Sequence, residues 1–355
     1  MTISHSDNYI PYHARNIEDI TIAGCSGNLT VVASVGGDSR QLTLSPLNGV
    51  VVLSASDLLK GFDIGEALNL STVLSSDDPR VLPLPTFLVK AVETSTSVTY
   101  SRRIMDGGID GDDDVRFLTW RKPVTETFKG AREFLGFVCP PDAEECTVHI
   151  RVYFRLSGTE HRDISVSPSG KLSLVAVPVS YDTVRSMLDD TADDVVAYDV
   201  WATVGGIELP ARRYFVRSWP SGARCFVFRN TLGFYDTVYA TGKITTMLEG
   251  EARSFKCKDV ERELSNDAAG HIAASSGYIT TGRERVLWED FLSSCERYEL
   301  RDGELKRIIV TEYEFKPVIN ALASVDFTYH LGEKPVGRYY NDQPIEPFDY
   351  DLSEF

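Results

Sequence analysis

Histidines and acidic residues are the side chains in this chain that could bind a metal or transfer protons. The sequence contains no HExxH, no His-x-His pair, no GxSxG elbow and no glycine-rich phosphate loop. Two converging carboxylates, as a glycosidase needs, could come from any of the 52 acidic residues, so they support an enzyme only weakly. We predict a non-enzyme with no catalytic, cofactor-binding or metal-binding residue, including among its histidines: His5, His13, His149, His161, His271 and His330.

An acidic run is the other place where a metal could bind. Residues 110–114 read Asp-Gly-Asp-Asp-Asp. An EF-hand loop needs Gly at its sixth position and Glu at its twelfth, but counting from Asp110 these are Val115 and Arg121. We interpret the run as a solvated acidic linker. A calcium site of another kind, at a domain junction, stays the alternative.

Aromatic side chains could form a platform on which a sugar ring stacks. The candidate binding residues are Trp201, Trp219, Tyr339 and Tyr340. Because the interiors of β-sandwiches commonly hold Trp and Tyr, burial in a core is the alternative for these rings.

The net charge is −16, from 52 acidic and 36 basic residues. Nucleic-acid affinity comes largely from Lys and Arg on phosphates, and the chain has no basic run, so we expect no nucleic-acid partner. No apolar run approaches the ~18 residues of a membrane helix, and the amino terminus shows no signal-peptide pattern. We therefore expect a protein made in the cytoplasm, with no membrane partner.

The six cysteines are widely spaced and include no CxxC pair. We expect reduced and mostly buried thiols, since a chain of this size needs no disulfide staples. A disulfide between Cys139 and Cys146 across a turn is the alternative.

The dominant pattern is alternation of apolar and polar residues, broken by Gly, Pro, Asn and Asp, which indicates half-buried strands. A first set comprises strands at 29–35, 41–44 and 50–53 and a short helix at 55–60 capped by Ser54. A second set has the same order: strands at 147–154, 163–166 and 171–177, and a helix-compatible stretch at 181–188. The offset of ~120 residues suggests a duplicated domain, with coincidence among short strands as the alternative.

The following strands are less regular. Residues 195–204 form the clearest strand, and Gly205-Gly206 supplies a two-residue hairpin turn. The returning strand at 207–217 contains Pro210, which indicates a sheet edge or a bulge. Strands at 225–228 and 237–239 lead to a segment of mixed pattern.

One helix stands out in the last third of the chain. Thr281 and Glu284 form a capping box, and the apolar stripe that follows consists of Leu287, Trp288, Phe291 and Leu292. Strands at 306–312 and 324–330 close the domain. Residues 341–355 hold five acidic residues and no basic one, which predicts a frayed end or an arm that docks on a neighbour.

The predicted fold class is mainly β: tandem β-sandwich domains of the Ig or fibronectin-III-like kind, then a C-terminal α+β domain with one main helix. The expected domains are a first sandwich at 1–110, a second at 111–222 that repeats it by hypothesis, a β-rich domain at 223–335 with its helix near 283–293, and an acidic extended tail at 336–355.

Three segments carry a family resemblance, in the same order along the chain. They are residues 103–109 with 117–123; residues 226–238 with Thr241 and Gly242; and residues 276–298 with 305–310 and 327–329. Together they resemble a family of poorly characterised, tail-associated virion proteins of phages and prophages of gut anaerobes. Within the second segment, Gly233 permits a tight reversal, and we expect Asp236 and Thr237 to bond backbone amides of that turn.

The resemblance implies a structural protein of the virion with no catalytic residue to carry over. It implies protein partners, namely other virion or tail proteins and further copies of the chain. The alternative is a carbohydrate-binding or adhesive β-sandwich module that faces a glycan, with a glycan hydrolase as a third and weaker reading.

Overall fold

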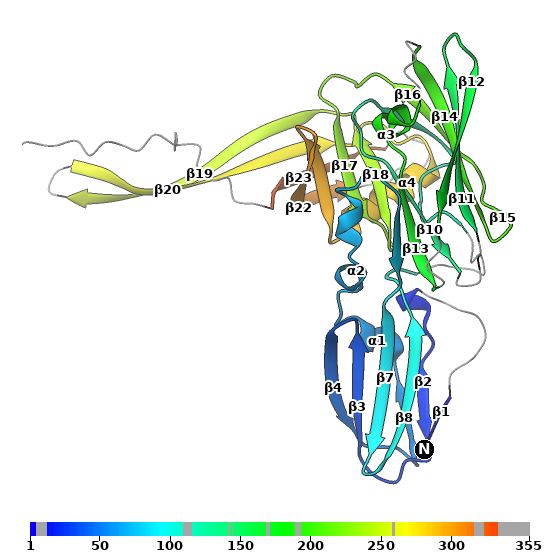
Figure 1. Ribbon diagram of the computed structural model, residues 1–355. Coiled ribbons are helices and arrows are strands. Elements are labelled where there is room, and N and C mark those ends of the chain that lie inside the picture. The colour runs from blue at the N-terminus through cyan, green and yellow to red at the C-terminus, as the bar shows by residue number, and fades with distance from the viewer. Residues whose placement is uncertain are drawn as a thin grey trace, which may run out of the picture.

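Figure 1 shows a computed structural model of the protein, whose fold is mainly β as predicted. The structure describes residues 1–4, 13–108, 116–140, 143, 145–167, 171–188, 193–257, 260–315 and 323–332, with the backbone alone at residues 4 and 248–269. The acidic run at 110–114, the tail at 336–355 and the candidate residues Tyr339 and Tyr340 lie outside the described residues.

The amino-terminal domain is a sandwich of two antiparallel sheets. One sheet has the order β1 (Thr2–Ser4), β2 (Ile20–Ala23) and β5 (Val50–Leu53); the other has β4 (Asp38–Leu44), β3 (Leu29–Val35), β7 (Thr86–Glu93) and β8 (Thr96–Arg103). Every second residue of β3 is buried, so its apolar face fills the space between the sheets. The short helices η1 (Ala14–Asn16) and α1 (Ala55–Leu59) contact each other, and Ser54 caps α1 by accepting from the Asp57 amide, as predicted.

The second domain is also a sandwich. Its smaller sheet has the order β10 (Phe134–Cys139), β13 (Ser173–Pro178) and β6 (Arg80–Pro83); its larger sheet has β12 (Thr159–Val166), β11 (Cys146–Phe154), β14 (Val195–Val204), β16 (Arg212–Arg217) and β9 (Val124–Phe128). The two-residue strand β15 (Ile207–Glu208) pairs with β14. The helix α3 (Tyr181–Ser186) follows β13, and its buried Tyr181 and Val184 join the core between the sheets.

The two sandwiches share one strand order. In each, a hairpin (β3–β4, β11–β12) is followed by a strand of the opposite sheet (β5, β13), by a short helix (α1, α3) and by a strand that pairs with the first hairpin strand (β7, β14). They differ after α1, where α2 (Ile64–Ala67), η2 (Leu70–Val73) and β6 intervene. Because β6 pairs with β13, the range 1–110 includes a strand that belongs to the second sandwich.

The third domain is one antiparallel sheet with a helix against it. Its strand order is β18 (Tyr235–Ala240), β17 (Arg224–Arg229), β21 (Arg297–Arg301), β22 (Glu304–Phe315), β23 (Val325–Leu331), β20 (Val260–Ser275) and β19 (Ile244–Cys257). The helix α4 (Gly282–Ser293) begins after Thr281, whose Oγ1 accepts from the Glu284 amide at 3.2 Å, as the capping box predicts. Its predicted stripe is buried against apolar residues of the sheet, among them Phe226, Phe228 and Phe327.

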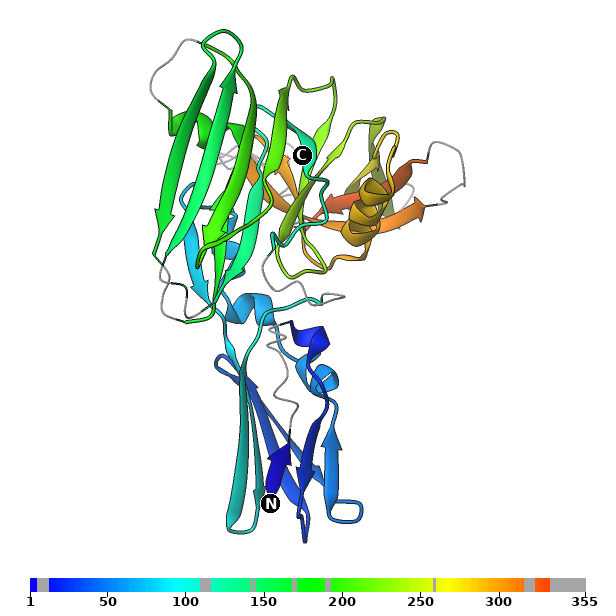
Figure 2. The same ribbon diagram turned by 90° about the vertical axis from the view of Figure 1, so that its right-hand side faces the viewer.

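One apolar cluster joins the second and third domains and the α2–β6 segment that follows the first sandwich. It contains residues of the α2–β6 segment, of the second sandwich and of the third domain, among them Leu70, Leu84, Phe134, Leu174, Val227 and Phe234. The two upper domains lie side by side, with the first sandwich below them (Figure 2). Burying apolar surface of both domains in a single core fixes how the second and third domains sit on one another, and Met105, which follows β8, ties the end of the first sandwich to that core.

Backbone contacts tighten this junction. A Cβ on Gly136 of β10 would lie 2.6 Å from the ring of Phe234. A Cβ on Gly233, where φ is +84°, would lie 2.1 Å from the carbonyl oxygen of Asp106. Glycine is therefore required at both places, by close approach at the first and also by its backbone conformation at the second.

Two expected segments differ from the structure. The segment of mixed pattern after residue 239 contains the two longest strands, β19 and β20, which the sequence did not predict. They leave the sheet as a ribbon (Figure 1), and their sequence lacks the period-two alternation by which half-buried strands are recognised. The strand expected at 207–217 is divided into β15 and β16 around Pro210, which has no amide hydrogen to donate.

The longest described helix, α4, has 12 residues. None of the helices in the described part of the chain has the length and apolar character needed to cross a bilayer.

Gly136→Ala should lower the free energy of unfolding by about 1–3 kcal/mol, because the added methyl group overpacks the contact with Phe234. The midpoint of urea unfolding measures this loss. Gly282→Ala is the matched control, since its Cβ meets nothing within 4 Å and alanine favours the helix. Equal stability of the two variants would show that Phe234 does not pack closely on Gly136.

Candidate functional site

Polar and aromatic side chains gather on the outer face of the second sandwich, across β12, β11 and β14. His149 in β11 lies opposite Asp163 in β12 and opposite Trp201 in β14. His161 precedes Asp163 by two residues, so both side chains point to the same side of β12. We call these four residues, His149, His161, Asp163 and Trp201, the histidine face.

Hydrogen bonds hold the histidine face together. The Oδ1 atom of Asp163 lies 2.6 Å from His149 Nδ1 and 3.2 Å from His161 Nε2. On its other side, His149 Nε2 lies 3.0 Å from the hydroxyl oxygen of Thr203. The side chain of His149 is 18% exposed, whereas those of His161 and Asp163 are 47% and 53% exposed. One fixed imidazole thus lies beside two groups that solvent can reach.

The predicted binding residue Trp201 belongs to this face. Its indole stacks on His149 and His161, with ring centroids 5.0 and 5.4 Å apart, and the Arg151 guanidinium carbon lies 5.4 Å from it. The ring is half-buried and already has three close neighbours. Sugar stacking at Trp201 stays a prediction.

The structure places Trp219 elsewhere. Its ring stacks on Phe128 at 4.8 Å and meets Tyr239 of the third domain edge-on at 5.9 Å. Its Nε1 donates to the Lys129 carbonyl oxygen at 2.5 Å, and 36% of the residue is exposed. Trp219 thus packs at the junction of the second and third domains, and the structure does not bring it together with Trp201.

A buried ion pair lies in the same junction. Arg121 donates to Glu133, which also accepts from the hydroxyl of Tyr239, and both charged residues are buried. Burial raises the pKa of Glu133, and the guanidinium of Arg121 opposes that shift. The guanidinium carbon also lies 5.9 Å from the ring of Tyr214 and 5.6 Å from that of Tyr239. This arrangement fixes the Arg121–Glu133 ion pair at the junction of the second and third domains.

The segments that carry the family resemblance meet at a second polar cluster. Asp236 accepts from the Trp120 amide at 3.0 Å and from Asn230 Nδ2 at 2.8 Å. Asp290 of α4 accepts from the amide and the hydroxyl of Thr231, at 2.9 and 3.1 Å. Burial raises the pKa of Asp290 to about 6, against the lowering effect of these hydrogen bonds. The cluster ties the linker before β9, the β17–β18 turn and α4 to one another.

The expectation that Asp236 and Thr237 bond the amides of the β17–β18 turn is wrong. The side-chain oxygen of Asn230 accepts from the Leu232 and Phe234 amides, each at 3.0 Å. Thr237 donates to the Arg132 carbonyl oxygen at 2.7 Å. Asp236 and Thr237 lie in β18, beyond the turn, because both pair with residues of β17. Their side chains are therefore directed away from the turn amides and bond the Trp120 amide and the Arg132 carbonyl oxygen.

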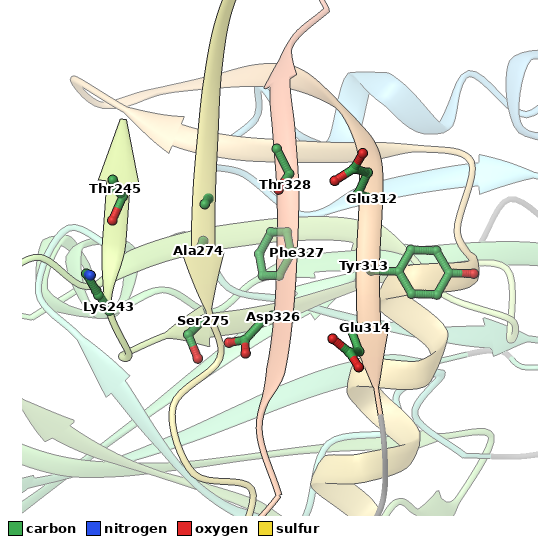
Figure 3. A pocket seen from close by; sticks show the side chains of 11 residues that line it. Lys243, Thr245, Ala274, Ser275, Glu312, Tyr313, Glu314, Asp326, Phe327 and Thr328 are labelled. Atoms are coloured by element: carbon green, nitrogen blue, oxygen red, sulfur yellow. The ribbon is translucent and has the colours of Figure 1, made fainter. Parts of the chain in front are cut away.

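A hollow of about 650 Å³ crosses four strands of the third domain (Figure 3). The register places Asp326 beside Ser275 and Glu314, and Thr328 beside Ala273 and Glu312. Alternate residues therefore put three carboxylates, those of Glu312, Glu314 and Asp326, on one side of the sheet. One basic residue, Lys243, also lines the hollow, so the root of the β19–β20 ribbon has three carboxylates and one ammonium group and is acidic on balance.

The cysteines Cys25, Cys139, Cys146 and Cys225 are free and buried, and Cys295 is free and exposed. A hydrogen bond with Cys139, together with burial, raises the pKa of Cys146. The two thiols are therefore neighbours at the ends of β10 and β11.

Comparisons with known proteins give only remote likenesses. No family model and no curated protein matches the chain. Among solved structures, a chain of the virion of a native gene transfer agent particle is 9% identical over 31% of this chain and 92% of that chain, with a TM-score of 0.22. A chimeric titin Z1Z2-Z1Z2 tandem is 12% identical (57% and 90% covered, TM-score 0.15), and the N-terminal four Ig domains of a Dscam1 isoform are 7% identical (86% and 84% covered, TM-score 0.16). At these TM-scores, the likenesses carry no argument about function.

Sequence reasoning missed the cluster of His149, His161 and Asp163. The available signal was the spacing of two between His161 and Asp163, next to a strand that contains His149. The expected strand began at Asp163, whereas β12 begins at Thr159 and so includes His161. A hairpin register worked out for β11 and β12 would have set Asp163 opposite His149.

Glu133→Gln should lower the free energy of unfolding by about 3–5 kcal/mol at pH 7, because it leaves the buried Arg121 without a counter-charge. Glu126→Gln is the matched control, since its pair with Arg217 is exposed and worth at most about 1 kcal/mol. Urea unfolding of both variants measures the difference. A loss below 1 kcal/mol for Glu133→Gln would show that Glu133 is already neutral.

Asp290→Asn should change how stability depends on pH. The folded-state pKa of Asp290 is raised from 3.8 to about 6, so the folded protein favours the protonated carboxyl. The contribution of this carboxyl to the free energy of unfolding is therefore complete below pH 4 and is lost as the pH rises through 6. Between pH 4 and pH 7, the free energy of unfolding of Asp290→Asn should therefore rise relative to that of the parent protein, by on the order of 1–3 kcal/mol. Urea unfolding at four pH values tests this, with the exposed Glu289→Gln as control; parallel curves for Asp290→Asn and the parent would contradict it.

Proposed function

We propose that the protein is a non-enzymatic structural subunit of a phage or prophage particle, associated with the tail or baseplate. It acts through protein–protein interfaces, with further copies of itself and with other virion proteins as partners. The observation that carries the proposal is the ribbon of β19 and β20, which extends from the body of the molecule (Figure 1).

Among the strands that the structure describes, the ribbon pairs with the rest of the sheet near its root. β20 pairs with β23 over four residues, Ile272–Ser275, but it pairs with β19 out to Cys257 and Val260. We call residues 247–257 and 260–271 the arm. Within the described part of the chain, the strand residues of the arm pair only with each other.

A free arm of this kind favours a partner on physical grounds. A two-stranded ribbon is only marginally stable by itself in water. Its two outer edges also present backbone N–H and C=O groups that another chain can pair with. A neighbouring subunit that adds a strand or packs on the arm would satisfy these groups, which is how β-augmented assemblies are held together.

The rest of the molecule suits a scaffold. The apolar cluster around Phe234 and the buried pair of Arg121 and Glu133 join the second and third domains, so a force on the arm is carried by both domains. The acidic hollow at the root of the arm favours a basic segment on the partner. The net charge of −16 disfavours contact with packaged DNA.

Replacing residues 248–270 by Asn-Gly joins Met247 to His271, which face each other in the register, through a two-residue hairpin turn. This variant should fold with an unchanged thermal midpoint and stay monomeric. The full chain should form larger species as its concentration rises, measured by sedimentation velocity.

Leu156→Ala is the control, because it changes an exposed apolar residue at the tip of a different hairpin, β11–β12. It should assemble like the parent protein. The proposal fails if the arm-less variant enters particles and oligomers as the full chain does, or if mass spectrometry of purified particles finds no such chain.

A further inference from the structure

The histidine face holds a set of side chains that metal ions bind in proteins. Its ligand atoms are two imidazole nitrogens, from His149 and His161, and one carboxylate oxygen, from Asp163. They come from one hairpin, β11–β12, whose register of eight paired residues fixes their relative positions. A set of two histidines and one carboxylate suits divalent transition metals, zinc above all, because imidazole and carboxylate are both good ligands for Zn²⁺.

The spacing of these atoms fits a single ion. One ligand atom from each of the three residues lies within 4.8 Å of the others, and Asp163 Oδ1 is 2.6 and 3.2 Å from the two nitrogens. Around a tetrahedral zinc ion with bonds of 2.0–2.1 Å, ligand atoms stand about 3.3 Å apart. Small side-chain rotations at the exposed His161 and Asp163 therefore suffice to enclose an ion.

A supporting group orients the most buried ligand. His149 Nδ1–H now donates to Asp163, while Nε2 lies 3.0 Å from the Thr203 hydroxyl oxygen. When Nδ1 binds the metal, the one proton of the neutral imidazole passes from Nδ1 to Nε2 through solvent, and Nε2–H then donates to Thr203 Oγ1. Metal-bound histidines usually have such a partner on their second nitrogen, which fixes the ring and its tautomer.

The charge of the three ligands favours a bound cation. The Asp163 carboxylate supplies one negative charge among the three ligands. The cation Arg151 lies opposite His161 in the register and over the Trp201 ring, and its charge is also near the carboxylate of Asp199. The Trp201 indole stacks on both imidazoles and so covers part of the site from water.

We propose that His149, His161 and Asp163 bind one Zn²⁺ ion on the outer face of the second sandwich. Three protein ligands leave one position of a tetrahedral ion open to water or to a donor from another molecule. The site lies on the β11–β12 hairpin and is independent of the arm, so it holds or fails separately from the proposed assembly role.

The test is calorimetric titration of the metal-free full-length protein with ZnCl₂, with CoCl₂ absorption spectra as a second readout. The parent protein should bind one Zn²⁺ per chain and give the intense visible bands of four-coordinate Co²⁺. Thr203→Val should weaken binding by about 10–100-fold, as expected for loss of a supporting group. His161→Gln and Asp163→Asn each remove a ligand and should weaken it further, with the cobalt bands lost.

Both ligand variants change exposed side chains, and an unchanged thermal midpoint in metal-free buffer confirms that they fold. His271→Gln is the matched control, because its ring lies in the third domain beside that of His330. It should bind zinc as the parent does. No stoichiometric binding by the parent, unchanged affinity in His161→Gln and Asp163→Asn, or equal loss in His271→Gln would each overturn the proposal.

Discussion

The packing of Phe234 on the backbone of Gly136 is the contact on which the arrangement of the domains depends. A side chain at position 136 would hold the β17–β18 turn away from β10, and the apolar cluster around Phe234 could not close. That cluster also includes residues of the α2–β6 segment, which connects the first sandwich to the second. Close packing of this kind leaves little room for the domains to move against each other.

Buried polar groups at the domain junctions make this packing specific for one arrangement. The pair of Arg121 and Glu133 and the cluster around Asp236 are buried, and the bonds from Trp120 to Asp236 and from Tyr239 to Glu133 join segments far apart in the sequence. Buried polar groups are costly unless they are paired, so such networks favour one geometry over its alternatives. Residues of three segments far apart in the sequence, around Trp120, Asp236 and Asp290, meet here.

The two surface features point outward from this rigid body in different ways. The arm offers backbone edges, a chemistry suited to another protein chain, whereas the histidine face offers nitrogen and oxygen ligands, a chemistry suited to a metal ion. The arm is placed by the third domain and the histidine face by the second. Scaffold and binding surface are thus separate parts of one molecule.

The sequence by itself determined the fold class, most strands, the capped helices and the residues of the α4 stripe, since alternation and capping are local properties of the chain. It could not show that β6 joins the second sandwich, that β19 and β20 leave the sheet, or that Asp163 lies between His149 and His161. Those features depend on which strands pair and in what register. Alternation states which side of a strand is buried, but the neighbour on each edge is chosen only when the whole core packs.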